Sequence, residues 1–176
     1  WEASGYAKPV RLYFLEEVVL PNAVAMEPLK GPNKENIAKI GVTIGIWHMM
    51  RSDDERAFVL AHEMSHLVAL DVSHILKLAE ELVPVWIESP EGKKTWKRLS
   101  AQKLSEEEKT ERLVQRFNQA VMNPKKRQIE SYADLNAMNL MRLAGYDVGA
   151  AIAFLDRVRE HYPEQDVLDI DSDHPA

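Results

Sequence analysis

The apolar and polar positions of the chain follow two different patterns, one in the first third and another in the rest. Near the N-terminus, β-branched and aromatic residues gather in Val10–Leu20, β-branched residues recur in Ile37–Ile44, and Asn22–Met26 between them shows a weak alternation. Runs of this length and composition, bounded by proline and glycine, are typical of strands. From Gly45 onward the apolar positions mostly recur at helical spacing. Three short strands followed by many helices predict an α+β fold.

Capping residues, glycines and prolines predict where the helices begin and end. Ser52 and Glu55 form a capping box ahead of the second helix. Pro84 is expected to stop the third helix, and Gly145 to close the fifth. The helices are expected over Gly45–Met50, Asp53–Leu70, Ser73–Val83, Thr95–Met122, Lys125–Ala144 and from the cap Asp147 to about His161.

One of these helices is apolar on every side. The stretch Ala57–Leu70 is wholly apolar apart from His62, Glu63, Ser65 and His66. A helix that is apolar all round is a buried helix. Burying imidazoles and a carboxylate alone costs several kcal/mol, so such groups are normally paired or bound to a metal. The chemistry of this protein is therefore expected in this helix.

His62 and His66 stand at i and i+4, so both rings leave the same face of the helix, one turn apart. Two imidazole nitrogens so placed can share one zinc ion at roughly 2.0–2.1 Å. Glu63 is rotated by about 100° and can reach a metal-bound water as a general base, which is the His-Glu-x-x-His pattern of metallohydrolases. The alternative is two core histidines bonded to backbone, with Glu63 paired to a distant arginine. That alternative needs three separate partners where one metal suffices.

A catalytic zinc ion needs a third protein ligand, and the candidate lies on a later helix. Glu130 and Asp134 stand at i and i+4 among apolar neighbours, where two like charges repel unless a cation lies nearby. We expect Glu130 to bind the metal and Asp134 to accept the second ring N–H of His62, which fixes the orientation of the ring. The alternative is a solvent-facing acidic pair beside the basic run Lys125–Arg127.

Composition limits the remaining possibilities. The chain has 176 residues, 45% hydrophobic and 28% charged, which favours one globular domain over residues 1–176. A net charge of −6 argues against a nucleic-acid partner, and the basic run Lys93–Arg98 is expected to be a solvated helix face. With no cysteine, the chain has neither disulfides nor thiolate ligands. It has no run of about 18 apolar residues, so no membrane span is expected.

The motifs occur together with four shorter elements in a fixed order. The motifs are His62-Glu63-Met64-Ser65-His66 and Glu130-x-x-Ala133-Asp134. The shorter elements are Asn22-Ala23-Val24-Ala25, Val42-Thr43-Ile44-Gly45, Ala144-Gly145-Tyr146-Asp147 and Ser172-Asp173-His174-Pro175. Together they resemble the M48 zinc metallopeptidases, the family of the HtpX-like and CAAX prenyl proteases, in its soluble single-domain branch. The resemblance spans about Val10 to Pro175.

The resemblance implies a gluzincin-like fold with one zinc ion per chain, held by His62, His66 and Glu130. It implies that Glu63 activates the attacking water, and that His174 lies near the site, where it stabilises the oxyanion or caps the zinc. It also implies that substrate lies along an edge strand within Ile40–Gly45 by β-augmentation. The substrate-binding residues expected on this basis are Ile40, Gly41, Val42 and Thr43, together with Asn22, which is also a candidate oxyanion donor.

The expected function is that of a zinc-dependent metalloendopeptidase that hydrolyses peptide bonds in protein or peptide substrates, in protein quality control of the cell envelope. One alternative is a zinc-bound but weakly active, chaperone-like binding module that docks a partner through the polar segment Glu91–Met122. Another is a metal-free helical interaction protein. Because the sequence begins with Trp1 rather than Met, we expect a trimmed chain. A periplasmic or envelope location fits this, with a cytoplasmic one as the alternative.

Overall fold

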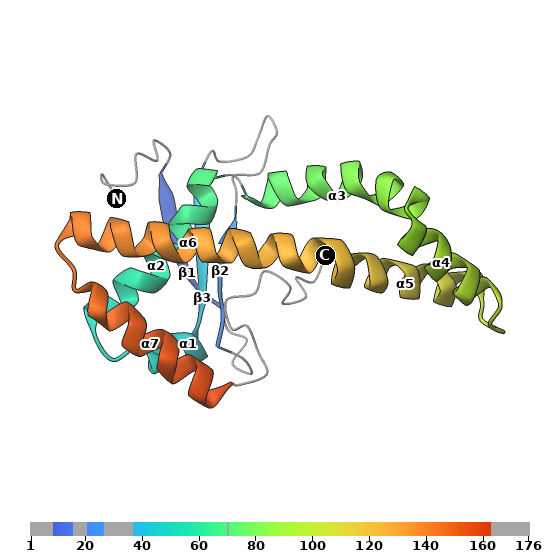
Figure 1. The fold of residues 1–176 in the computed structure, drawn as a ribbon. Helices are drawn as coiled ribbons and strands as arrows, with labels where there is room; N and C mark the ends of the chain where they lie inside the picture. The colour runs from blue at the N-terminus through green and yellow to red at the C-terminus, as the bar shows by residue number, and fades with distance from the viewer. Residues whose placement is uncertain (1–8, 16–20, 27–36, 70, 163–176) are drawn as a thin grey trace. The chain divides into compact units, whose positions relative to one another are not determined.

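A computed structural model describes residues 9–15, 21–26, 37–69 and 71–162, which fall into two compact units (Figure 1). The first unit comprises residues up to Asp71 and from Ile129 onward, and the second comprises Val72–Gln128. The strands are β1 (Val10–Leu15), β2 (Ala23–Met26) and β3 (Ala38–Thr43). The helices are α1 (Ile44–Met49), α2 (Asp53–Ala69), α3 (Asp71–Glu88), α4 (Pro90–Ser100), α5 (Glu106–Phe117), the π-helix η2 (Asn118–Met122), α6 (Asn123–Ala144) and α7 (Val148–His161). Within these ranges, no helix combines the length and apolarity that crossing a membrane requires. A small sheet with a mainly helical remainder agrees with the α+β prediction, and the extent of a single domain over residues 1–176 stays a prediction.

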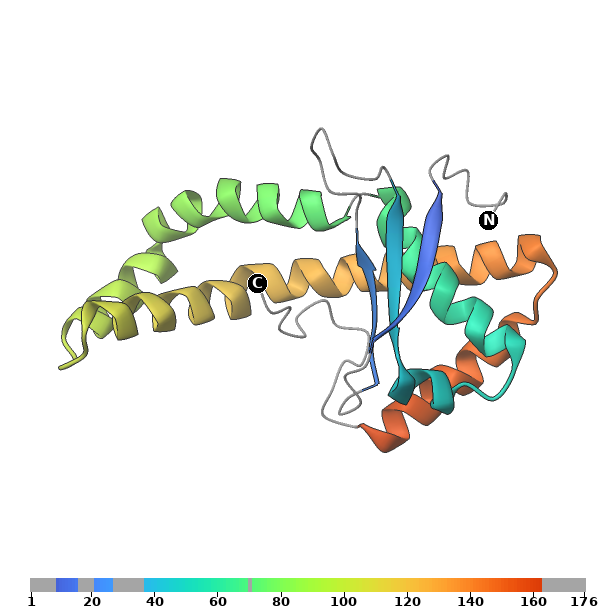
Figure 2. The same cartoon turned by 180° about the vertical axis from the view of Figure 1, so that it is seen from behind.

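The three strands form one sheet in the order β1-β3-β2 (Figure 2). β1 runs parallel to β3, with Leu12 opposite Ile40, and β2 runs antiparallel to β3, with Ala25 opposite Ile40. β3 is therefore the central strand, and its backbone groups are paired on both sides. The prediction that Ile40–Gly45 is an edge strand is wrong, because an incoming peptide would find these hydrogen bonds already made. Gly45 does not extend the strand either, since it belongs to α1.

The core of the first unit forms where α2 packs against one face of the sheet and against α7. Ile40 and Val42 of β3 are buried, and so is every residue of α2 from His62 to Leu67. Phe58 of α2 meets Phe154 of α7 edge-on, with ring centroids 6.3 Å apart. The prediction that the motif helix is buried on all sides is confirmed over this stretch.

The start of α2 departs from the predicted capping box. The backbone N–H of Glu55 donates to Ser52 Oγ at 3.2 Å, as expected for an N-cap. The Glu55 carboxylate instead accepts from the backbone N–H of Arg51 at 2.7 Å and pairs with the Arg157 guanidinium of α7. Both partners of that ion pair are largely buried. Glu55 thus keeps a local backbone partner, one residue earlier than a capping box requires, and adds a long-range partner that joins α7 to the beginning of the motif helix.

The second unit corrects three helix boundaries. α3 continues past Pro84, because Trp86 beyond the proline is buried against Phe117, with ring centroids 5.6 Å apart. The predicted helix over Thr95–Met122 is divided after Ser100, and α5 restarts at a capping box formed by Ser105 and Glu108. Ahead of α6 the backbone stays helical through η2, where the wider π-helical turn accommodates the proline at the start of α6.

Candidate metal centre

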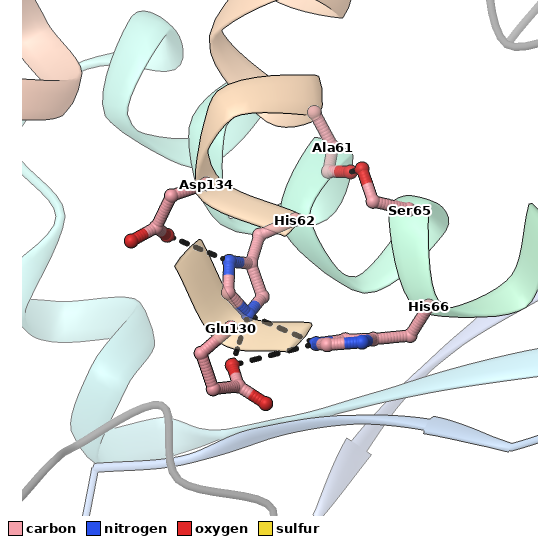
Figure 3. A network of polar contacts seen from close by, with 6 residues as sticks. All are labelled: Ala61, His62, Ser65, His66, Glu130 and Asp134. Atoms are coloured by element: carbon pink, nitrogen blue, oxygen red, sulfur yellow. Dashed lines mark hydrogen bonds and ion pairs between the residues drawn. The ribbon is translucent and has the colours of Figure 1, made fainter. Parts of the chain in front are cut away.

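The polar groups of the motif helix meet two carboxylates of α6 inside the first unit (Figure 3). His62 and His66 come from consecutive turns of α2, and their side chains are 1% and 5% exposed. Glu130 and Asp134 come from consecutive turns of α6 and face them. The helical spacing in both motifs thus produces two pairs of side chains that meet across one helix–helix contact. Ser65, another polar residue of the stretch, donates to the carbonyl of Ala61 at 2.9 Å within its own helix.

Three atoms at this contact have the spacing of metal ligands. His62 Nε2 lies 3.1 Å from His66 Nε2 and 3.1 Å from Glu130 Oε2, and His66 Nε2 lies 3.6 Å from the same oxygen. Tetrahedral ligands held at roughly 2.0–2.1 Å from a zinc ion lie about 3.3–3.4 Å from one another. Glu130 Oε1 is also buried and has no hydrogen-bond partner among the described residues. The donor set and this orphaned oxygen fit a divalent metal such as zinc.

Asp134 is placed to orient the first histidine. Its Oδ1 lies 2.9 Å from His62 Nδ1, so the ring N–H at that nitrogen donates to the carboxylate. This leaves Nε2 of His62 directed toward His66 and Glu130, as Figure 3 shows. A carboxylate in this position fixes the tautomer of a metal-binding histidine and increases its basicity. The contact is the one that the sequence predicts, while the role of Asp134 stays a proposal.

The charges around the centre favour a cation. Burial by itself lowers the pKa of His62, but hydrogen bonds to Asp134 and Glu130 outweigh it and raise the pKa from 6.5 to about 10. Burial works against ionisation of Glu130, yet hydrogen bonds from His62 and His66 hold its pKa below the ordinary value. In the absence of a metal, a proton on His62 thus supplies the positive charge. A metal ion would take its place and release that proton.

Glu63 belongs to α2, one residue beyond the first histidine, and its side chain approaches Ala25 of β2. Its side chain is buried, and burial raises the pKa of its carboxyl group, while the charges of His62 and His66 and, more weakly, a hydrogen bond from the backbone of Ala25 act in the opposite direction. The sequence pattern identifies Glu63 but does not identify Ala25, because Ala25 contacts Glu63 through its backbone and not through its side chain. Only its position in the element Asn22-Ala23-Val24-Ala25 draws attention to this strand.

The residues expected to bind substrate lie in the core or in structural hydrogen bonds of the sheet. Ile40 and Val42 belong to the core, and Thr43 Oγ1 caps α1 by accepting from the N–H of Ile46. The backbone N–H of Asn22 donates to the same hydroxyl at 2.8 Å, and its carbonyl accepts from the N–H of Thr43 at 2.9 Å. These contacts join the beginning of β2 to the end of β3. Gly41 lies between Ile40 and Val42 in the central strand and is buried, and His174 lies outside the described residues.

Two comparisons relate the whole chain to known proteins. The family model of peptidase family M48 matches residues 5–176, nearly the whole chain. No curated protein matches the sequence.

Proposed function

Since the chain belongs to peptidase family M48, a family of metallopeptidases, we propose that it is a zinc-dependent metalloendopeptidase acting on protein or peptide substrates. One observation carries the proposal. Possible ligand atoms of His62, His66 and Glu130 lie within 4.8 Å of one another. The buried residue Glu63 directly follows His62 in the same helix. A metal site without a neighbouring base would support binding alone, whereas this arrangement supports hydrolysis.

The residues of the centre divide the chemistry among them. His62, His66 and Glu130 would hold the zinc ion, which when bound polarises the scissile carbonyl and lowers the pKa of a water toward about 7. The Glu63 carboxylate takes a proton from the attacking water and delivers it to the leaving amine. Burial suits Glu63 to this task, because a carboxyl group with a raised pKa holds a proton more readily between the two transfers. Asp134 positions the ring of His62.

Substrate would pair with β2 rather than with β3. In an antiparallel pair, successive residues direct their backbone groups alternately toward the neighbouring strand and away from it. The carbonyl of Asn22 points toward β3, where it accepts from Thr43, so the backbone groups of Ala23 and Ala25 point away from β3. The hydrogen bond between the Ala25 backbone and Glu63 agrees with this direction. A peptide added along this edge by β-augmentation would therefore lie beside Glu63.

The direct test compares zinc content and turnover in matched variants. Glu63→Gln keeps the size of the side chain but cannot accept the proton, so it should retain zinc and lose at least about a hundredfold in the rate of casein cleavage. Glu130→Ala should lose both zinc and turnover. Glu160→Gln, an exposed position on α7, controls for the chemical change itself and should behave like the wild type.

The outcomes separate the proposed function from its alternatives. Cleavage retained by Glu63→Gln would mean that another group is the base. A wild-type protein that contains one zinc ion per chain but cleaves no unfolded protein would refute the peptidase proposal and favour a zinc-bound binding module. A chain that takes up no zinc after reconstitution would refute the metal centre as well.

A further inference from the structure

An apolar cavity lies on the other side of the motif helix. It has a volume of about 300 Å³, opens to solvent, and is lined by residues of β1, β3, α2 and the C-terminal part of α6, all within the first unit. From α2 it is lined by Ala57, Leu60, Ala61 and Met64, which recur at i, i+3, i+4 and i+7 and so share one face of the helix. At 100° per residue, His62 and His66 leave the opposite side of α2. The cavity is thus separate from the metal centre.

The lining favours a ligand whose buried part is apolar. None of the described residues around the cavity carries a charge, and the one polar side-chain group among these described residues is the hydroxyl of Tyr146, a residue 43% exposed. A polar ligand would lose its hydration here without gaining hydrogen bonds. Small-molecule sites have this character, with mainly apolar walls and a few polar groups that fix orientation. A bound molecule would therefore place an apolar body inside and a polar end near Tyr146.

The dimensions of the cavity favour a chain over a compact ring. The lining extends along α2 from Ala57 to Met64, seven residues or roughly 10 Å. This length exceeds the reach of a single apolar side chain of a protein partner. An apolar cavity of about 150 Å³ takes up benzene, so the volume here has room for an alkyl chain of roughly ten carbons.

We propose that this cavity binds the aliphatic chain of a single-chain amphiphile, such as a medium-chain fatty acid, with its polar head at the Tyr146 end. The proposal does not depend on the peptidase function, because the cavity and the metal centre occupy different sides of α2. The ligand would contact the face of α2 that lies opposite His62 and His66.

The experiment is a calorimetric titration of the whole chain with unbranched fatty acids of increasing length, kept below their aggregation concentrations. We expect one site per chain and an affinity that rises about fourfold for each added methylene, the ratio that corresponds to roughly 0.8 kcal/mol per buried CH₂. The rise should stop near ten carbons, where the cavity is full. The same curve is expected for the protein with and without zinc, so a failed metal centre would not alter the result.

Two variants test the location independently. Ala57→Leu fills the cavity from α2, and Ala144→Leu fills it from the end of α6. Each adds three carbons to the lining and should move the end of the affinity rise from about ten carbons to about seven. Ala153→Leu makes the same change at an exposed position on α7 and should leave the curve unchanged. Two filling positions are used so that loss of folding in one, checked by circular dichroism, leaves the other to decide.

Three results would overturn the proposal. The first is the absence of saturable binding for every chain length in the wild type. The second is an affinity that keeps rising beyond ten carbons or a stoichiometry above one, since either indicates unspecific partition onto the surface. The third is a folded Ala57→Leu or Ala144→Leu variant whose curve equals that of the wild type.

Discussion

Replacement of Asp134 gives the sharpest measure of how the centre is organised. Its carboxylate does not belong to the three-atom cluster, yet it accepts the Nδ1–H of His62 at 2.9 Å. Removing it by Asp134→Ala leaves His62, His66 and Glu130 in place but frees the His62 ring to rotate and lowers its basicity. The prediction is weaker zinc binding without loss of the site.

The magnitude follows from the burial of the two partners. Loss of a carboxylate behind a metal-binding histidine typically weakens metal binding about 10–100-fold. The Asp134 side chain is 32% exposed whereas His62 is 1% exposed, so solvent screens part of the interaction and the lower end of that range applies. We expect about a tenfold loss for Asp134→Ala, which corresponds to about 1.4 kcal/mol. Asp134→Asn keeps an acceptor oxygen but not the charge, and because charge-assisted bonds are about twice as strong as neutral ones, it should lose about threefold.

The assay is competition for zinc against a chromophoric chelator at fixed pH. Asp156→Ala serves as the control, because Asp156 is exposed on α7 and pairs only locally with Arg159 at 3.1 Å among the contacts described. Its zinc affinity should equal that of the wild type. An Asp134→Ala protein that binds zinc as tightly as the wild type would refute the positioning role. A complete loss of binding would also contradict it, since that result is expected of a ligand.

Three further predictions concern stability. Phe154→Ala removes a fully buried ring from the contact between α7 and α2, and it should lower the free energy of unfolding by about 3–5 kcal/mol in urea titrations; a loss below 1 kcal/mol would contradict the packing. Gly145→Ala should cost about 1 kcal/mol, since the backbone there has φ +83° and no neighbour would obstruct the methyl group, and an unchanged melting temperature would refute this. In chelator-treated protein the raised pKa of His62 stabilises the fold below pH 6.5, and this contribution should disappear as the pH rises toward about 10. Melting temperatures of that metal-free protein that do not fall over this range, relative to a zinc-loaded sample, would contradict the assigned charge.

Local pattern was sufficient for most of the elements and for the members of the candidate centre. Helical spacing determines which side chains share a face, so the i and i+4 pairs His62/His66 and Glu130/Asp134 can be predicted from the sequence alone. An apolar run that includes a few polar groups implies burial, and burial of α2 is what the structure shows. The end of α6 at Gly145, with its positive φ, is likewise a property of the local backbone.

Contacts between distant segments decided the rest. The sequence of β3 does not reveal its place in the sheet, because the same backbone groups can pair in a central or an edge strand. β3 is central because β1 and β2 pair with it on its two sides. Glu55 pairs with Arg157, about a hundred residues away in sequence, in addition to its local backbone partner Arg51. Pro84 remained inside a helix because the burial of Trp86 outweighed the local cost of the proline. The sequence by itself therefore determined which groups share a helix face, whereas the tertiary structure decided which strand edge, which ion pair and which cavity result, since these depend on packing between segments that local periodicity does not relate.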